Sequence, residues 1–468
     1  MSLDLCYMTA TEMSRRFRDG SLSPVEATKA ALDRIAAVDG KVNAYRETDE
    51  TGAMQAARES EARWKAGRPL SDIDGVPTSI KDLMATKGMA TLRGSKTVDP
   101  AGPWDTDSPL VARLRDAGAV ILGKTTTPEF GWKGVTDSPA TGITCNPWNL
   151  GKTPGGSSGG ASAAAAAGMG VLHVGSDGGG SIRIPAGFAG IFGHKPSFGR
   201  IPYHPYSPMG TLSHAGPMTR TVADSLAMMK VMMGEDDIDW FTLPLAEVDE
   251  AVLTAGVKGM KIAFSPDFGY ADVDDEVAAT VQAAADQLAE LGAEIVQVDP
   301  GFECPVEIFN KHWMAGAHAG LGALPDDAKA LLDPGLQKVL VEGAKVTLAE
   351  YMNAATERAN LGGHMKQFMR DYDLLITPTL AVPAFSVGRL VPDHMDEDDE
   401  NAWVAWTPFS YPFNLTQQPA CSVPCGFTST GLPVGLQMVG RMFDDATVFR
   451  AAAAYEAATD WTDRRPDL

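Results

Sequence analysis

The chain has 468 residues, of which 44% are hydrophobic and 21% charged, so it is long enough for a large enzyme, and its composition excludes a disordered or fibrous protein. Its 60 Asp and Glu outnumber its 39 Lys and Arg, which gives a formal charge of −21. Nucleic acids and anionic membranes bind basic faces, so we expect neither as a partner.

The first quarter of the chain alternates helical and extended patterns. Ser23, Pro24 and Glu26 form a capping box with proline in the first helical position, so we expect a helix that begins there and stops at Gly40. The segments that follow are expected to be extended at 42–46, helical at 53–66, extended at 76–80, helical at 108–117 and extended at 119–122.

The segment 146–200 is rich in Gly, Ser and Ala and differs in composition from its flanks, so we look for the chemistry there. Within it, 161–167 is expected to be a buried helix and 171–176 a strand. Later strands are expected at 260–264, 293–298, 374–377, 420–423 and 434–439, and helices at 274–291, from Thr347 onward, and at 445–458. This alternation predicts an α/β sheet between helices, in one domain over 1–468, since no repeat or linker interrupts it.

The cysteines, the N-terminus, the acidic run and the histidines suggest an intracellular protein without a metal site. Five scattered cysteines are typical of a reducing compartment, and the N-terminus lacks a signal-peptide pattern, so we expect a cytoplasmic protein. The acidic run 393–400 lacks the glycine and spacing of an EF-hand, which favours a solvated loop. The eight histidines show no HExxH pattern and no paired spacing, so we expect no metal and no cofactor. His214 and His318 are the two that could face a pocket, although packed or surface histidines are more common.

Two familiar motifs occur in the wrong structural context. Residues 118–125 match a phosphate-loop pattern, but its variable positions form an apolar strand instead of a loop. Residues 155–159 match the nucleophile elbow, yet the residues before them cannot form the strand that an elbow requires. A Ser-His-Asp hydrolase therefore stays only as an alternative.

A more informative pattern surrounds Ser181. Three glycines precede this serine at 178–180, and glycine lets backbone amides approach a ligand closely. A helix that starts just after the serine would favour an anion at the same place. The residues alone fit either an oxyanion hole or a tight structural turn. In the same way Lys81, at the end of an expected strand, would by itself be an ordinary surface lysine.

Four segments taken together, 146–148, 155–160, 177–183 and 193–196, resemble the amidase signature family, which includes fatty acid amide hydrolase and malonamidase. The resemblance extends over nearly the whole chain. It implies a large mixed, twisted sheet with a catalytic core at about 75–225. It also implies an amidohydrolase that acts on a small-molecule amide without a cofactor, as a monomer or homodimer.

The resemblance also assigns roles to single residues. Lys81 would be the base, Ser157 a bridging serine preceded by a cis peptide, and Ser181 the nucleophile that forms an acyl-enzyme. The backbone amides of Gly178, Gly179, Gly180 and Ser181 would form the oxyanion hole, supported by Ser158, Asp177 and Arg183.

The substrate is less well defined by the sequence. Four aromatic residues are expected in the acyl pocket and favour an aryl or apolar acyl amide, including anilides, esters and carbamates: Phe130, Trp132, Trp313 and Phe409. One alternative is the glutaminase subunit of a tRNA-dependent amidotransferase, but 407–416 looks more like the stand-alone amidases, and the negative charge poorly suits a tRNA-associated assembly. A noncatalytic binding protein is disfavoured because Lys81, Ser157 and Ser181 are all present.

Overall fold

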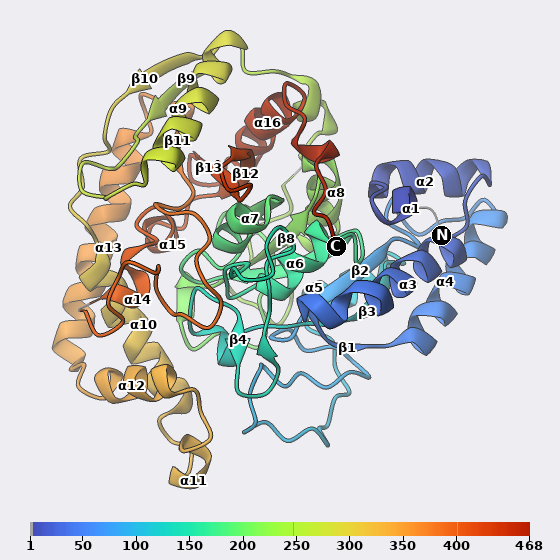
Figure 1. The fold of residues 1–468 in the computed structure, drawn as a ribbon, viewed down its shortest axis with the longest axis horizontal. Helices are drawn as coiled ribbons and strands as arrows, with labels where there is room; N and C mark the ends of the chain where they lie inside the picture. The colour runs from blue at the N-terminus through green and yellow to red at the C-terminus, as the bar shows by residue number, and fades with distance from the viewer. Residues whose placement is uncertain (1–2, 247, 400) are drawn as a thin grey trace.

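One large mixed sheet forms the centre of the computed structural model, which describes residues 3–246, 248–399 and 401–468 (Figure 1). The sheet has 11 strands, and helices cover both of its faces, so the predicted α/β class is confirmed. In spatial order the strands are β1 (Tyr45–Thr48), β3 (Val120–Thr125), β2 (Pro77–Lys81), β6 (Leu172–Asp177), β8 (His214–Thr219), β7 (Phe192–Lys195), β12 (Ala420–Phe427), β13 (Pro433–Gly440), β11 (Leu374–Pro378), β9 (Lys261–Phe264) and β10 (Glu294–Gln297).

Strand direction changes along this sheet. Strand β2 runs parallel to both β3 and β6, and β9 runs parallel to both β10 and β11, whereas the strands between these two groups pair antiparallel. Parallel strands bring their carboxyl ends to the same edge of a sheet. The ends of β2 and β6 are therefore neighbours, and Lys81 contacts Ser176, which lies 95 positions later in the sequence.

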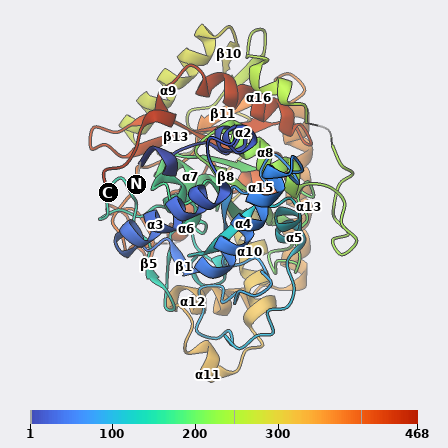
Figure 2. The same ribbon diagram turned by 90° about the vertical axis from the view of Figure 1, so that its right-hand side faces the viewer.

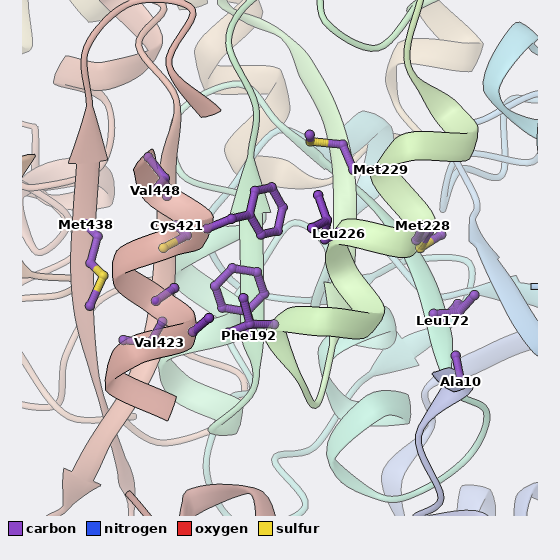
Figure 3. Packing of buried hydrophobic residues seen from close by; sticks show 14 of the residues in the cluster. Ala10, Leu172, Phe192, Leu226, Met228, Met229, Cys421, Val423, Met438 and Val448 are labelled. Carbon is purple, nitrogen blue, oxygen red and sulfur yellow. The ribbon is translucent and has the colours of Figure 1, made fainter. Parts of the chain in front are cut away.

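Helices α8 (Val222–Met232) and α16 (Asp445–Glu456) cover one face of the sheet. Their apolar side chains, among them Leu226 and Val448, pack with Phe192, Cys421 and Val423 of the central strands in one buried cluster (Figure 3). Cys421 and Val423 are two positions apart in β12, so their side chains point to the same face.

The opposite face is covered by α6 (Gly159–Ala166) and α7 (Arg183–Ala189), which consist largely of small residues. Gly187 of α7 faces Ser422, which lies between Cys421 and Val423 and so points the other way. A Cβ on Gly435 would lie 2.9 Å from the Cα atom of Gly187, so these glycines permit close helix-to-sheet contact. All residues of α6 are buried, as expected for the Ala-rich segment.

Two predicted helix starts are confirmed, and one predicted stop is wrong. Capping boxes open α3 (Pro24–Val42) at Ser23 and α13 (Leu348–Phe368) at Thr347. Helix α3 continues through Gly40 and ends at Asn43, which adopts a left-handed conformation with φ 57°. The segment 42–46, predicted as extended, is thus partly helical, and β1 begins only at Tyr45. A Cβ on Gly40 would meet no atom within 4 Å, whereas Val38 and Val42 on either side are buried and hold this turn of the helix in place.

The remaining elements surround this core. The other predicted helices lie close to their expected positions, as α4 (Glu50–Lys65), α5 (Pro109–Asp116) and α9 (Asp275–Glu290). Helices α10 (Val306–Leu321), α11 (Asp326–Lys329) and α12 (Pro334–Gly343) lie at the end of the molecule opposite β10 (Figure 2). The further elements are α1 (Leu3–Cys6), α2 (Ala10–Asp19), α14 (Ala402–Ala405), α15 (Pro412–Leu415), the two-stranded sheet of β4 (Asp137–Ser138) and β5 (Gly142–Ile143), and the short 3-10 helices Glu129–Gly131, Gly210–Leu212, Glu250–Thr254 and Trp461–Asp463.

The acidic run forms an exposed loop over residues 393–399, as predicted, and Glu400 lies outside the described residues. Two of its carboxylates pair with lysines, Asp393 with Lys152 and Asp398 with Lys338. Within the described ranges, no helix is both long enough and apolar enough to cross a membrane.

Candidate active site

Lys81 is completely buried at the carboxyl end of β2. Its Nζ atom lies 2.7 Å from Ser157 Oγ, 2.8 Å from Ser158 Oγ and 2.9 Å from Ser176 Oγ. The lysine that looked like a surface charge in isolation is therefore surrounded by three hydroxyl groups inside the protein.

This environment changes the charge of the amine. Burial lowers the pKa of Lys81 well below its ordinary value, and only the nearby carboxylate of Asp177 acts in the opposite direction. Neutral hydroxyls do not compensate a buried positive charge as a paired carboxylate would. A neutral amine can accept a proton, so Lys81 has the properties of a base.

Ser157 lies in the glycine-rich loop that leads into α6, and the peptide bond between Gly156 and Ser157 is cis, as the resemblance implied. A Cβ on Gly156 would lie 2.6 Å from the carbonyl carbon of Val135, so no larger residue fits there. Thr136 Oγ1 donates a hydrogen bond to the carbonyl of Gly155 and holds the start of the loop. These contacts fix Ser157 against Lys81.

Ser181 lies in the turn between β6 and α7, and the side chain of Asp177 holds this turn by hydrogen bonds. The Asp177 carboxylate accepts hydrogen bonds from the backbone N–H of Gly180 at 2.7 Å and of Ile182 at 3.2 Å. The backbone N–H of Ser158 donates to the carbonyl of Ser181 at 3.2 Å, which joins this turn to the first serine loop.

One of the four backbone amides predicted for the oxyanion hole already has an acceptor within the protein. The Gly180 amide already donates to Asp177, whereas the amides of Gly178, Gly179 and Ser181 have no acceptor among the described residues. A Cβ on Gly179 would lie 2.6 Å from the Phe309 ring, and one on Gly178 would lie 2.9 Å from the Trp313 ring. Aromatic packing thus requires glycine at both positions.

Arg183 connects this turn to the C-terminal part of the chain through hydrogen bonds. The buried guanidinium contacts both oxygens of Asp177 at 3.0 Å and donates to the Ser410 carbonyl, to Asn414 Oδ1 and to Gln437 Oε1. Burial alone would raise the pKa of Asp177, but the charge of Arg183 outweighs it, and the net pKa of Asp177 lies below its ordinary value. Asp177 therefore stays ionised.

A small cavity of about 20 Å³ lies beside Ser181, roughly the space that one or two water molecules need. Two of the four aromatic residues predicted for the pocket, Trp132 and Trp313, line it. The other two do not: Phe130 has a left-handed backbone conformation and is absent from the lining, and Phe409 is buried against the ring of Phe268 at 5.0 Å. Apolar character in the sequence does not separate the pocket from the core, since large apolar residues are mostly buried in either place.

Phe309, which the sequence did not single out for the site, completes this wall together with Trp403. A second cavity of about 640 Å³ shares Trp132, Lys133 and Trp403 with the small one. It lies toward α12 and the acidic loop. The shared residues therefore separate Ser181 from a cavity large enough for a small organic molecule.

Ser176 was also missed. It is the penultimate residue of β6, and its backbone N–H donates to Ser158 Oγ at 3.2 Å while its own side chain contacts Lys81. The parallel pairing of β2 with β6 brings the two strand ends together, so a search for polar residues at neighbouring carboxyl ends could have found it.

The histidines do not form a competing site. His214 Nδ1 contacts the Leu212 carbonyl at 2.8 Å, and the one histidine that contacts a serine among the described residues, His173, is buried with Ser79 inside the sheet. Within the same ranges, no group of three or more His, Cys, Asp or Glu side chains could hold a metal ion. The geometry of a Ser-His-Asp hydrolase is thus lacking around Ser157 and Ser181.

Comparison with known proteins gives a consistent result. The family model "Amidase" matches residues 26–449. An acylamidase of Rhodococcus erythropolis is 38% identical over 468 residues, covering 99% of this chain and 98% of that protein. A glutamyl-tRNA(Gln) amidotransferase component of Myxococcus xanthus (strain DK1622) is 36% identical over 493 residues, covering 100% of both chains. The crystal structure of a bacterial aryl acylamidase superposes with a TM-score of 0.91 at 29% identity, covering 98% of this chain and 97% of the other.

Proposed function

The chain belongs to the amidase signature family, whose members hydrolyse carbon–nitrogen bonds of amides, and from this premise we propose that it cleaves its substrate through a covalent ester on Ser181. The observation that carries the proposal is the 2.7 Å contact between the buried Lys81 amine and Ser157 Oγ, next to the turn that holds Ser181. In this arrangement Lys81 is the base, Ser157 is the proton carrier and Ser181 is the nucleophile.

In the proposed first step, Ser181 Oγ attacks the substrate carbonyl carbon. Its proton passes to Ser157, whose own proton passes to the neutral Lys81 amine. When the carbon–nitrogen bond breaks, the amine leaves with a proton from Ser157, which Lys81 replaces. Water then attacks the ester along the same proton path, and the carboxylic acid and Ser181 are released.

We assign the oxyanion hole to the amides of Gly178, Gly179 and Ser181. In this assignment the Gly180 amide serves a different purpose, because its hydrogen bond to Asp177 fixes the curvature of the turn. Preorganised donors of this kind each contribute about 10²–10³-fold in kcat in hydrolases.

Ser158, Asp177 and Arg183 act as positioning residues in this proposal. Ser158 Oγ donates to the carbonyl of Ser176 at 3.1 Å and contacts Lys81, so it orients the amine toward Ser157. Asp177 and Arg183 hold the nucleophile turn, and the Asp177 charge limits how far the Lys81 pKa falls.

For the substrate we propose an aryl or apolar acyl amide, with anilides, esters and carbamates included. The aromatic side chains beside Ser181 support this class, because they offer apolar surface and stacking faces. The charged residue of the lining, Lys133, is already paired with Asp137 and Asp333. Among the relatives, one is named an acylamidase and another an aryl acylamidase. The small cavity must widen to admit such an acyl group, and movement of Trp403 toward the larger cavity would provide the space.

The glutaminase component of an amidotransferase remains the second candidate, because proteins of that name match this chain along nearly their whole length. We favour the stand-alone amidase, since Trp132 and Trp313 suit an apolar group better than a glutamine side chain.

We further propose that the chain works as one domain over 1–468 with its catalytic part at about 75–225. In this proposal it is a cytoplasmic monomer or homodimer that binds neither nucleic acid nor membrane, as its negative charge favours.

A fluorophosphonate probe with peptide mass spectrometry tests the assignment of the nucleophile. We expect one adduct per chain on Ser181, no adduct in Ser181→Ala, and loss of amide hydrolysis in parallel with labelling. An adduct on another serine, with hydrolysis lost, would place the nucleophile elsewhere.

A further inference from the structure

A cavity of about 860 Å³ lies between α13 and the segments 415–418 and 441–443. Its volume is within the range of small-molecule sites. Four basic residues line it, Arg358, Lys366, Arg370 and Arg441, and no acidic residue is among the described residues of the lining. We call this cavity the basic cleft.

The basic cleft contrasts with the formal charge of −21 of the whole chain. Arg441 has one carboxylate partner, Asp373 at 3.1 Å. Arg358 donates to the carbonyls of Leu415 and Asn414 and to Thr211, none of which is charged. Carboxylates in ion-pair contact with Lys366 or Arg370 are absent from the described part of the chain. Three of the four positive charges are therefore uncompensated by a direct partner.

The rest of the lining is largely apolar. Met369, Leu415, Met442 and Phe443 contribute side chains, together with the small residues Ala355 and Ala359. Phe443 is 56% exposed, so its ring is accessible to a ligand. The cleft thus offers cationic groups and an apolar surface to the same ligand.

The backbone of the cleft is also unusual. Gln417 and Phe443 have φ angles of 65° and 70°, a region that residues other than glycine rarely occupy. Each conformation is held by a hydrogen bond, from Gln417 Nε2 to the Thr211 carbonyl and from the Phe443 N–H to Ser197 Oγ. Such conformations persist only where the surroundings enforce them, and they cluster at ligand sites.

We propose that the basic cleft binds a small organic anion with an apolar body, such as a medium-chain or aryl carboxylate. The anionic group contacts Lys366 and Arg370, and the apolar body lies against Met442 and Phe443. Charge complementarity selects this class, because a neutral ligand would leave the cations unpaired and a cation would be repelled. The proposal goes beyond amide hydrolysis and does not depend on it.

Calorimetric titration of the full-length chain with octanoate tests the proposal. We expect saturable binding of one octanoate per chain, weakened at least about tenfold by Lys366→Gln/Arg370→Gln, because two charge-assisted contacts are removed. Octan-1-ol, which has the same apolar body without the charge, should give no saturable binding.

The matched control is Arg58→Gln/Lys65→Gln, which removes the same charges from α4, on the opposite side of the molecule from α13 in Figure 1. It should bind octanoate like the unmodified chain, and both double variants should retain amide hydrolysis. Absence of saturable binding, or equal binding by both double variants, would overturn the proposal. So would loss of hydrolysis in Lys366→Gln/Arg370→Gln with unchanged octanoate binding, since the cleft would then belong to the catalytic cycle.

Discussion

Replacing Lys81 by methionine is the most direct test of the proposed mechanism. Methionine keeps the unbranched shape and most of the volume of lysine but has no amine, so the fold should be preserved. The variant removes the common partner of Ser157, Ser158 and Ser176 at 2.7–2.9 Å. A general base contributes about 10²–10⁴-fold to a rate, and we expect the acylation rate to fall by that factor.

The pH dependence follows from the direction of the pKa shift. An unperturbed lysine has a pKa of about 10.4, so only about one in 2,500 is neutral at pH 7, and each unit by which burial lowers the pKa increases this fraction about tenfold. Since the neutral amine is the active form, the acylation rate of the unmodified enzyme should rise with pH through the lowered pKa of Lys81. Lys81→Met should lose this rise.

Stopped-flow measurement of acyl-enzyme formation across a pH series provides the assay, with a nitrophenyl ester and a nitroanilide of the same acyl group. The anilide should lose more than the ester in Lys81→Met, because its amine must receive a proton to leave. An unchanged pH profile with near-normal anilide cleavage would refute the assignment. A titration near about 6.5 that persists in the variant would instead indicate a histidine base.

Other predictions concern the nucleophile, its turn and the absence of a metal. Ser181→Ala should lose more than about 100-fold in turnover without a change in melting temperature; greater residual activity would place the nucleophile elsewhere. Gly179→Ala should lose activity because its Cβ lies 2.6 Å from the Phe309 ring, and Phe309→Ala in the same chain should restore part of it; no rescue would contradict this packing argument. Arg183→Met should lower the free energy of unfolding by about 3–5 kcal/mol, as denaturant titration would show, because Asp177 is left buried and unpaired. Because the pKa of Asp177 is lowered in the folded protein, the ionised carboxylate should stabilise the fold above about pH 4, and this stabilisation should disappear as the pH falls further. The loss of stability on acidification should be smaller in Arg183→Met. Dialysis against a chelator should leave activity unchanged; loss that zinc alone reverses would exclude the proposed mechanism.

The sequence was sufficient to predict the segments in which local pattern and burial agree. The capping boxes at Ser23 and Thr347 begin helices because each contains its own hydrogen-bond partners. The apolar run 119–122 became part of β3, which is buried along its whole length, so its character was visible in composition. The prediction that the helix after Ser23 stops at Gly40 was wrong because a glycine ends a helix only where the tertiary contacts allow it.

The site could be predicted from motifs but its surroundings could not. Lys81, Ser157 and Ser181 were found through a resemblance, and the structure supplies the contacts that the sequence cannot contain. Asn414 contacts Asp177 across 237 positions, and no local pattern signals such a pair. The aromatic residues that line the small cavity could not be predicted for a similar reason, since Trp313 at the cavity and Phe409 in the core are both large and apolar.

The long-range bonds of Arg183 also determine when activity can first arise during synthesis. Its partners Ser410, Asn414 and Gln437 are translated 227 to 254 residues after it. A nascent chain that ends before Ser410 already contains every residue of the proposed triad, yet Arg183 lacks its partners Ser410, Asn414 and Gln437, and β12 and β13 are absent. Truncated chains that lack this C-terminal part should therefore be inert although they contain Lys81, Ser157 and Ser181.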